Sequence, residues 1–187
     1  GLSALTLDAT TNDAITLTAD DALVALTATG TAANDSLSVV LANNDADVTY
    51  TGLAGDGDSL AITAGGNVDL IAATLETVSV TGSGEALVLD VTSDDAMDFN
   101  VAGDQNVTIE ADTDVVDDTT LTDTTTAGTT SLVVEAGTAV TVDLKGAGVL
   151  SGGITLDSVA TTGVTVVGGN TLTTAAGIQD LTITAND

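Results

Sequence analysis

The fold is decided by the stretch "NVDLIAATLETVSVTGSGEALVLDVTSDDAMDFNVAGDQNVTIE", residues 67–110, in which short apolar runs recur at a nearly fixed interval. Within each run, apolar residues alternate with Thr, Ser or Asp, and Gly, Asn or Asp ends the run. This pattern is typical of short β-strands bounded by turns. No window of the chain has the apolar spacing that favours a helix. The sequence therefore predicts an all-β protein.

Two features of this stretch share one period. Successive apolar-x-apolar doublets are 10, 9, 10 and 10 residues apart, measured between their first members, Val68, Val78, Leu87, Met97 and Val107. Polar turn positions are 9, 9, 9, 10 and 9 residues apart, at Asp58, Asn67, Glu76, Glu85, Asp95 and Asp104. A strand of about five residues cannot bury its own apolar face, so units of this length must stack on one another.

Two architectures stack such units. In a β-solenoid, each strand pairs in parallel with the equivalent strand one coil away, whereas a β-sandwich pairs sequential strands as antiparallel hairpins. The nearly constant period, the short doublets and the absence of proline favour the solenoid, because proline cannot donate to a continuous strand ladder. With two strand-turn units per coil, we expect a parallel β-helix, or β-solenoid, of roughly 20 residues per coil. β-Sandwich domains are the alternative.

The pattern is interrupted at residues 111–131, "ADTDVVDDTTLTDTTTAGTTS", where Thr and Asp are crowded and apolar residues are few. We therefore expect β-solenoid coils over residues 1–110 and further coils over 132–187. Between them, residues 111–131 form either an irregular Thr/Asp-rich excursion or a junction between two stacks. Any domain boundary is expected in this segment.

The charge of the chain limits its partners. There is one basic residue, Lys145, against 28 acidic residues, and the formal net charge is -27 at pH 7. Nucleic acids and anionic lipid surfaces bind through Lys and Arg, so we expect neither as a partner, and no long apolar run predicts membrane insertion. Because 43% of residues are apolar, the chain can fold if its repulsion is relieved. With one basic side chain, that relief must come from counterions.

Calcium is the counterion that the pattern favours. Ca²⁺ takes about six to eight oxygens from carboxylates and backbone carbonyls, and a solenoid stacks equivalent acidic turns above one another. A turn Asp also has a simpler interpretation, because it hydrogen-bonds to its own turn and remains solvated. The candidate Ca²⁺ ligands are Asp45 with Asp47, Asp56 with Asp58, Asp94 with Asp95 and Asp98, and Asp112 with Asp114, Asp117 and Asp118.

These features resemble a known family. The acidic, Gly- and Asp-punctuated β-repeat is similar to bacterial surface-layer (S-layer) proteins related to the calcium-binding RTX repeat family, whose nonapeptide is G-G-x-G-x-D-x-U-x with U a large apolar residue. "GDGDSLAI" from Gly55 is one residue short between its second Gly and Asp58, and "GGNVDLI" from Gly65 lacks the third Gly. The resemblance implies an exported protein that binds Ca²⁺ and assembles with copies of itself into a lattice. Any anchoring to a cell-surface glycan is expected outside this segment.

Catalysis has little support in the sequence. A polysaccharide lyase needs a basic residue to remove a proton, but His is absent and Lys145 is the one basic side chain. A glycosidase cleft needs aromatic platforms, and Phe99 and Tyr50 both fall in strand doublets. We therefore expect a non-enzymatic structural component of an extracellular surface layer, located at the cell surface. The alternative is a spacer or repeat module of a large secreted adhesin.

Overall fold

The computed structural model describes residues 2–9, 14–30, 35–42, 45–53, 57–93, 95–117, 119–135, 141–157, 163–174 and 182–186. Its elements are sixteen strands, one short α-helix, α1 (Thr113–Val116), and one 3-10 turn, η1 (Lys145–Ala147). The strands are β1 (Ala4–Ala9), β2 (Ala14–Ala19), β3 (Ala25–Gly30), β4 (Ser36–Leu41), β5 (Asp45–Thr51), β6 (Ser59–Ala73), β7 (Thr77–Thr92), β8 (Asp98–Gly103), β9 (Val107–Asp112), β10 (Leu121–Asp123), β11 (Thr130–Glu135), β12 (Thr141–Leu144), β13 (Gly153–Leu156), β14 (Gly163–Val167), β15 (Leu172–Thr174) and β16 (Thr182–Asn186).

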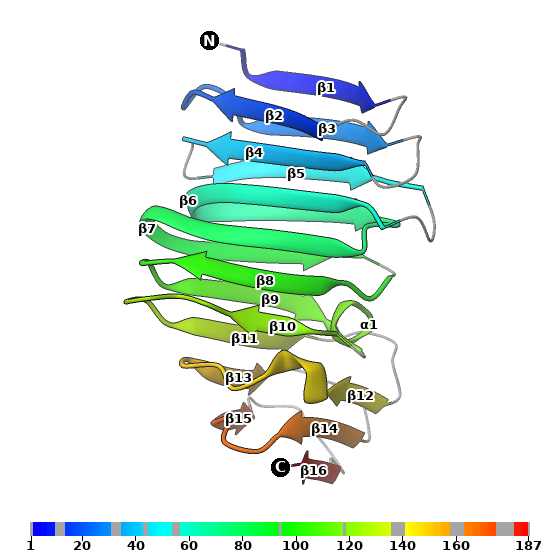
Figure 1. Ribbon diagram of the computed structural model, residues 1–187, viewed down its shortest axis with the longest axis vertical. Helices are drawn as coiled ribbons and strands as arrows, with labels where there is room; N and C mark the ends of the chain where they lie inside the picture. The colour runs from blue at the N-terminus through cyan, green and yellow to red at the C-terminus, as the bar shows by residue number, and fades with distance from the viewer. Residues whose placement is uncertain are drawn as a thin grey trace.

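The strands form a parallel β-solenoid, as the sequence predicts. All strand pairs within the described residues are parallel, which excludes the antiparallel hairpins of the sandwich alternative. The chain winds from β1 at one end of the stack to β16 at the other (Figure 1). One turn takes about 22 residues, close to the expected value of roughly 20.

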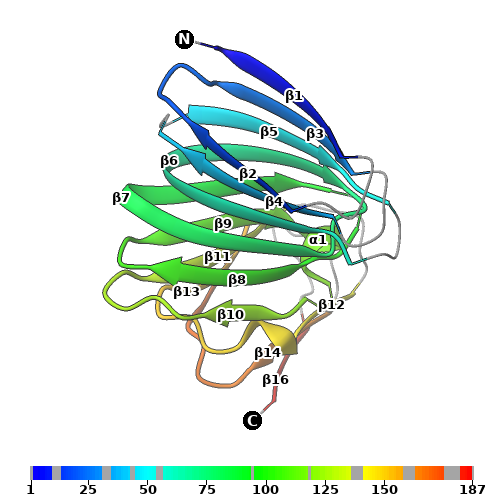
Figure 2. The same ribbon diagram turned by 45° about the horizontal axis from the view of Figure 1, so that its top comes forward.

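Two faces of the stack run side by side, and they can be followed in Figure 2. The first face has the strand order β1-β3-β5-β6-β7-β9-β11-β13-β15, and the second face pairs β2 with β4, β4 with β6, β6 with β7, β7 with β8, and β8 with β10. The long strands β6 and β7 belong to both faces. The beginning of β6 pairs with β4 on the second face, and its end pairs with β5 on the first face. Gly66 (φ 84°) and Gly84 (φ 83°) sit within these two strands and allow the chain to turn the corner.

The second face changes after β10. Within residues 111–131 the chain completes β9, forms the single helical turn α1, and adds β10 to β8 on the second face. Among the described residues, no strand of the next coil pairs with β10. Instead, β12 lies against α1, and β12, β14 and β16 form a separate three-stranded parallel sheet. The first face continues without a break, because β11 pairs with both β9 and β13.

The core lies between the faces and consists of columns of apolar side chains. The parallel register places Leu26, Val48, Leu70 and Val91 above one another on successive coils, and all four are buried. The doublets identified in the sequence are likewise buried, namely Val68/Leu70, Val78/Val80, Leu87/Leu89, Met97/Phe99 and Val107/Ile109. Each fully buried aliphatic side chain stabilises the fold by about 1.5–3 kcal/mol. Stacking therefore supplies the core that no single coil could form.

No helix in the described part of the chain is long and apolar enough to cross a membrane.

Candidate functional site

A column of carboxylates runs down the outside of the first face. Asp47 is the register partner of Asp69, Asp69 of Asp90, and Asp90 of Glu110. Each lies between two inward-pointing residues, so its own side chain points outward. We call these four residues the face ladder. Because neighbouring strands are about 4.8 Å apart, each carboxylate has a like charge directly above or below it.

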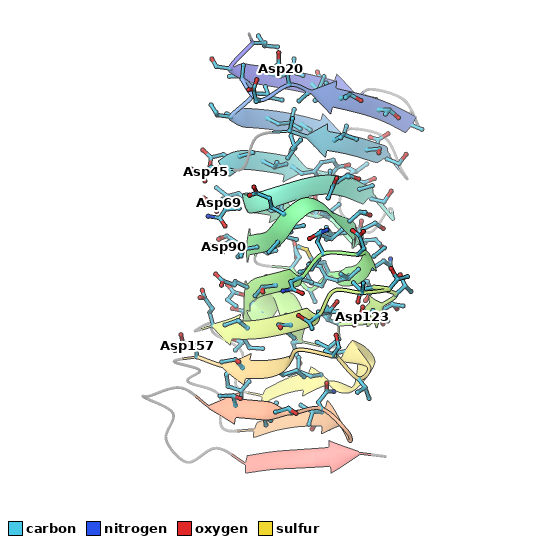
Figure 3. All side chains as sticks on the ribbon, turned by 90° about the vertical axis from the view of Figure 1, so that its left-hand side faces the viewer. Asp20, Asp45, Asp69, Asp90, Asp123 and Asp157 are labelled. Atoms are coloured by element: carbon cyan, nitrogen blue, oxygen red, sulfur yellow. The ribbon has the colours of Figure 1, made fainter. Side chains whose placement is uncertain are left out.

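The face ladder belongs to an acidic edge that spans several coils. Figure 3 shows Asp45, Asp69, Asp90 and Asp157 one after another along one side of the stack, with Asp123 on the other side. Asp112, two residues after Glu110 on β9, forms a further register pair with Glu135 on β11. The described residues therefore place acidic side chains on this side in consecutive coils from β5 to the end of β13.

The environment along this acidic edge raises the pKa of two carboxyl groups, those of Asp69 and Glu135. The pKa of Asp69 is raised from its ordinary value of 3.8, first by partial loss of solvation and then by the charges of Asp90, Asp47 and Asp45. The pKa of Glu135 is raised from 4.5, again first by loss of solvation and then by nearby acidic residues, with Asp90 and Glu110 the largest of them. Both shifts mean that the fold makes the charged form of these carboxyls less favourable.

A second acidic column lies at the corner where the chain enters the second face. Asp35, Asp58 and Glu76 each precede a strand segment of that face, and we call them the corner acids. Asp58 is 0% exposed, and its carboxylate accepts hydrogen bonds from the Asp35 amide (2.8 Å) and the Leu53 amide (2.9 Å). The Asp58 amide in turn donates to Glu76 Oε2 (2.7 Å). These carboxylates therefore satisfy backbone amides where the strand ladders stop.

The predicted Ca²⁺ ligands fall into different environments. Asp45 and Asp47 lie on the outer surface of β5, and Asp47 starts the face ladder. Asp95 Oδ2 accepts from the Thr74 amide (3.1 Å) of the preceding coil, whereas Asp98 Oδ1 accepts from the Thr120 amide (2.7 Å) of the following one. Asp95 therefore accepts from a backbone amide of the preceding coil and Asp98 from one of the following coil, so the two carboxylates are directed toward different coils.

The fourth predicted group surrounds α1. Asp112 caps this helix, because its Oδ1 accepts from the amides of Asp114 (3.0 Å) and Val115 (3.1 Å), while Asp117 is the C-cap. Asp56, Asp94 and Asp118 lie outside the described residues. Across the part of the chain that is described, no three acidic side chains gather into a group that could hold a metal ion. The described acids are arranged in columns of neighbours, with no closed cage.

The sequence analysis missed most of the face ladder. Asp69, Asp90 and Glu110 were not among the predicted ligands, which were chosen in turns. The signal was present as the middle residue of the triplets "ADV", "VDL", "LDV" and "IEA", which contain the four ladder residues. Successive strands along the chain belong to different faces, so the four acids are recognised as neighbours only when the sequence is aligned by whole coils. The steps between them are then 22, 21 and 20 residues.

The outer surface of the second face is uncharged over neighbouring coils. Its outward residues are small and mostly carry hydroxyl groups: Ser36 and Ser38 on β4, Ser59, Ala61 and Thr63 on β6, and Thr77, Ser79 and Thr81 on β7. A shallow hollow of about 140 Å³ lies over this part of the sheet. Over β4, β6 and β7 the second face therefore presents hydroxyl groups, whereas the first face presents carboxylates; the next strand of the second face, β8, begins with the exposed Asp98.

No protein-family model matches the chain, and no curated protein or solved structure is significantly similar to it. The resemblance to S-layer proteins therefore stays a prediction.

Asp58→Asn tests whether the corner acids hold the fold together. An asparagine keeps one acceptor oxygen but turns an NH₂ group toward the second backbone amide, so we expect a loss of about 1–3 kcal/mol of unfolding free energy. Urea unfolding at neutral pH measures it. Asp47→Asn is the control, because it removes the same charge from an exposed position and should not destabilise the protein. Equal effects of the two changes would contradict a structural role for Asp58.

The face ladder predicts an unusual pH dependence. A carboxyl whose pKa is raised in the folded state binds its proton more tightly when folded, so stability is lost as pH rises through that pKa. Without divalent cations, stability should therefore increase as pH falls from neutral through the raised pKa values of Asp69 and Glu135 toward their ordinary values of 3.8 and 4.5. Thermal melts across this range in chelator and low salt provide the measurement.

Two residues provide controls for the pH experiment. Asp69→Asn removes one of the raised groups and should flatten the dependence. Asp123 acts in the opposite direction: burial raises its pKa, but hydrogen bonds from the Thr125 amide (2.9 Å) and Thr125 Oγ1 (2.7 Å) outweigh this effect and lower it. Its stabilising contribution is present above its ordinary pKa of 3.8 and is lost below it. A steady loss of stability from neutral pH to about pH 5 would show that the ladder does not govern the titration.

Proposed function

We propose that this chain is a structural segment of an extracellular bacterial surface layer that binds Ca²⁺ along its acidic columns and assembles with copies of itself. The observation that carries the proposal is the face ladder. Four carboxylates, Asp47, Asp69, Asp90 and Glu110, are stacked in register on a chain with one basic residue and a net charge of -27. The chain itself provides almost no cations to neutralise them.

Electrostatics favours an external cation at the ladder. Two unit charges 4 Å apart repel by about 1 kcal/mol in bulk water and by several times that near a protein surface. A Ca²⁺ ion shared between neighbouring carboxylates replaces this repulsion with two attractions, and water completes its coordination shell. The pairs that fit such sharing are the neighbours within the face ladder and the register pair Asp112 and Glu135.

The proposed role is non-catalytic, and open strands support self-assembly. In the described residues, β1 pairs with β3 alone and β2 with β4 alone, so no described strand covers the other edge of either. Beside them an apolar groove of about 170 Å³ is lined by Leu2, Leu5, Leu17 and Leu23, and Leu2 is 59% exposed. Such an edge and the apolar groove beside it can be covered by a further strand pair, either from neighbouring sequence or from another copy, and the proposal assigns them to another copy.

The second face offers another surface for contact between copies. Two molecules of this charge repel strongly, and the part of the second face formed by β4, β6 and β7 is where their sheets can approach without opposing carboxylates. Anchoring to a cell-surface glycan belongs to sequence outside this segment in this proposal. The alternative function is a spacer in a secreted adhesin, and the continuous stack of the first face from β1 to β15 favours a rod of this kind.

A thermal melt with Ca²⁺ and with chelator, at constant ionic strength, tests the calcium part of the proposal. We expect Ca²⁺ to raise the melting temperature of the native protein. Asp69→Asn combined with Asp90→Asn should reduce this increase and should raise the melting temperature in chelator, because repulsion is removed. The control is Asp8→Asn with Asp104→Asn, which makes the same change in charge at exposed positions outside the ladder. Asp8 faces Thr29 in register and has no acid opposite it there.

Each outcome of the melts bears on the proposal. If chelator leaves the melting temperature of the native protein unchanged, Ca²⁺ does not stabilise the fold. If both double variants lose the same Ca²⁺ response, the effect comes from net charge and the face ladder is not the binding site.

Electron microscopy of the protein with Ca²⁺ separates the lattice from the spacer. Ordered two-dimensional sheets are expected for the surface layer, and isolated rods for the adhesin module. Ser38→Asp with Ser79→Asp should abolish the sheets if the second face is a contact surface, because like charges would then oppose one another across it. Thr155→Asp with Thr173→Asp adds the same charge to the outer side of the first face and is the matched control, which should leave the sheets intact. If ordered sheets still form in the Ser38/Ser79 variant, the second face is not the contact surface, and the strand edges of the first coil become the candidate.

A further inference from the structure

A small cavity lies at the corner of the solenoid where β3, β4 and β5 meet. Tyr50, near the end of β5, is 2% exposed, and its ring has Ala28 and Ala72 as register partners on the two adjacent coils. Because both neighbours are alanines, the column has room for the large ring. The phenol oxygen Tyr50 Oη is fully buried and has no hydrogen-bond partner among the described residues.

Two oxygens converge on this cavity. A Cβ atom added to Gly30 would lie 2.8 Å from Asp35 Oδ2 and 3.0 Å from Tyr50 Oη, so both oxygens lie close to the same side of Gly30. The cavity has a volume of about 10 Å³, and its lining includes these three residues together with the apolar side chains of Leu7, Ile15, Ala28 and Leu37. Asp35 is itself 2% exposed, so the carboxylate is as buried as the phenol. The glycine keeps this space open.

The chemistry of the cavity determines what it can hold. Burial and the charges of Asp58, Asp35 and Glu76 raise the pKa of Tyr50, so the phenol keeps its proton and needs an acceptor. A cation accepts no hydrogen bond and would leave this donor unsatisfied. A water molecule accepts from the phenol and also donates to a carboxylate, and a cavity of about 10–15 Å³ holds one water.

We propose that one buried water molecule occupies this cavity, accepts a hydrogen bond from Tyr50 Oη and donates one to Asp35 Oδ2. The water links the end of β5 to the corner acid of the preceding coil, across a corner where the strand ladder is interrupted. It would be a permanent part of the fold, because the cavity accommodates a single molecule. The proposal does not depend on calcium or on assembly, so it stands or falls apart from the proposed function.

Tyr50→Phe tests the proposal through the sign of its effect. If the water is present, the variant loses a donor to it, and the folding equilibrium constant should fall about tenfold. The melting temperature should then fall by about 3–6 °C. If the cavity is dry, the native phenol is an unsatisfied buried group and its removal should raise the melting temperature. An unchanged or raised melting temperature overturns the proposal.

A second hydroxyl deletion provides a baseline. Thr113 Oγ1 is also buried without a partner, and Thr113→Val removes it with little change in shape. Tyr50→Phe must lower the melting temperature relative to Thr113→Val for the water to be supported. Equal responses of the two variants would show that the Tyr50 hydroxyl behaves like any other unsatisfied buried hydroxyl.

A cation is the competing occupant, and the same variants identify it. The difference in melting temperature between the native protein and Tyr50→Phe should stay the same in chelator and when choline replaces sodium. A difference that disappears under either condition would show a bound cation and overturn the proposal. In a high-resolution crystal structure we expect one ordered water within hydrogen-bond distance of Tyr50 Oη and Asp35 Oδ2, and an empty cavity would overturn it. Gly30→Ala should disturb this water site, because its methyl group would press on both oxygens.

Discussion

The structure depends on the parallel register of its strands. Stacked parallel strands are about 4.8 Å apart and set each residue directly above its counterpart in the next coil, so a property that recurs along the sequence becomes a continuous column. Leu26, Val48, Leu70 and Val91 become a column of core, and Asp47, Asp69, Asp90 and Glu110 become a column of charge. The same geometry therefore produces both the main stabilising contact and the main repulsion.

The two acidic columns meet this constraint in different ways. At the corner, the strand ladders stop and leave backbone amides without partners, so Asp58 exchanges its solvation for two hydrogen bonds from amides. On the first face, the strand ladder already uses the backbone amides, and Asp69 has none to accept from. The raised pKa of Asp69, caused by lost solvation and then by its acidic neighbours, is the consequence. The corner acids are compensated inside the protein, and the face ladder depends on the solvent.

The sequence predicts the strands and the solenoid because a short period is visible without alignment of the coils. It does not predict which acids meet, because the step between register partners varies from 18 residues at Leu60 and Val78 to 23 at Val107 and Thr130. The predicted ligands were chosen by proximity along the chain, as in Asp95 and Asp98, whereas the ladder joins residues about one coil apart. The same limit applies to Tyr50. Its place in a strand doublet predicts that it is buried, but its closeness to Asp35 depends on how the chain turns at the corner, which the sequence does not show.

A fold of this kind has a stability that depends on the ionic composition around it. The apolar columns add roughly the same contribution with every coil, but each acidic coil added to the face ladder also adds a repulsion with its neighbours on both sides. The number of acidic coils that can be stacked is therefore limited unless cations accompany them. A cation bound between neighbours removes that limit and makes each added coil favourable again. Such a chain gains most stability where divalent cations are plentiful.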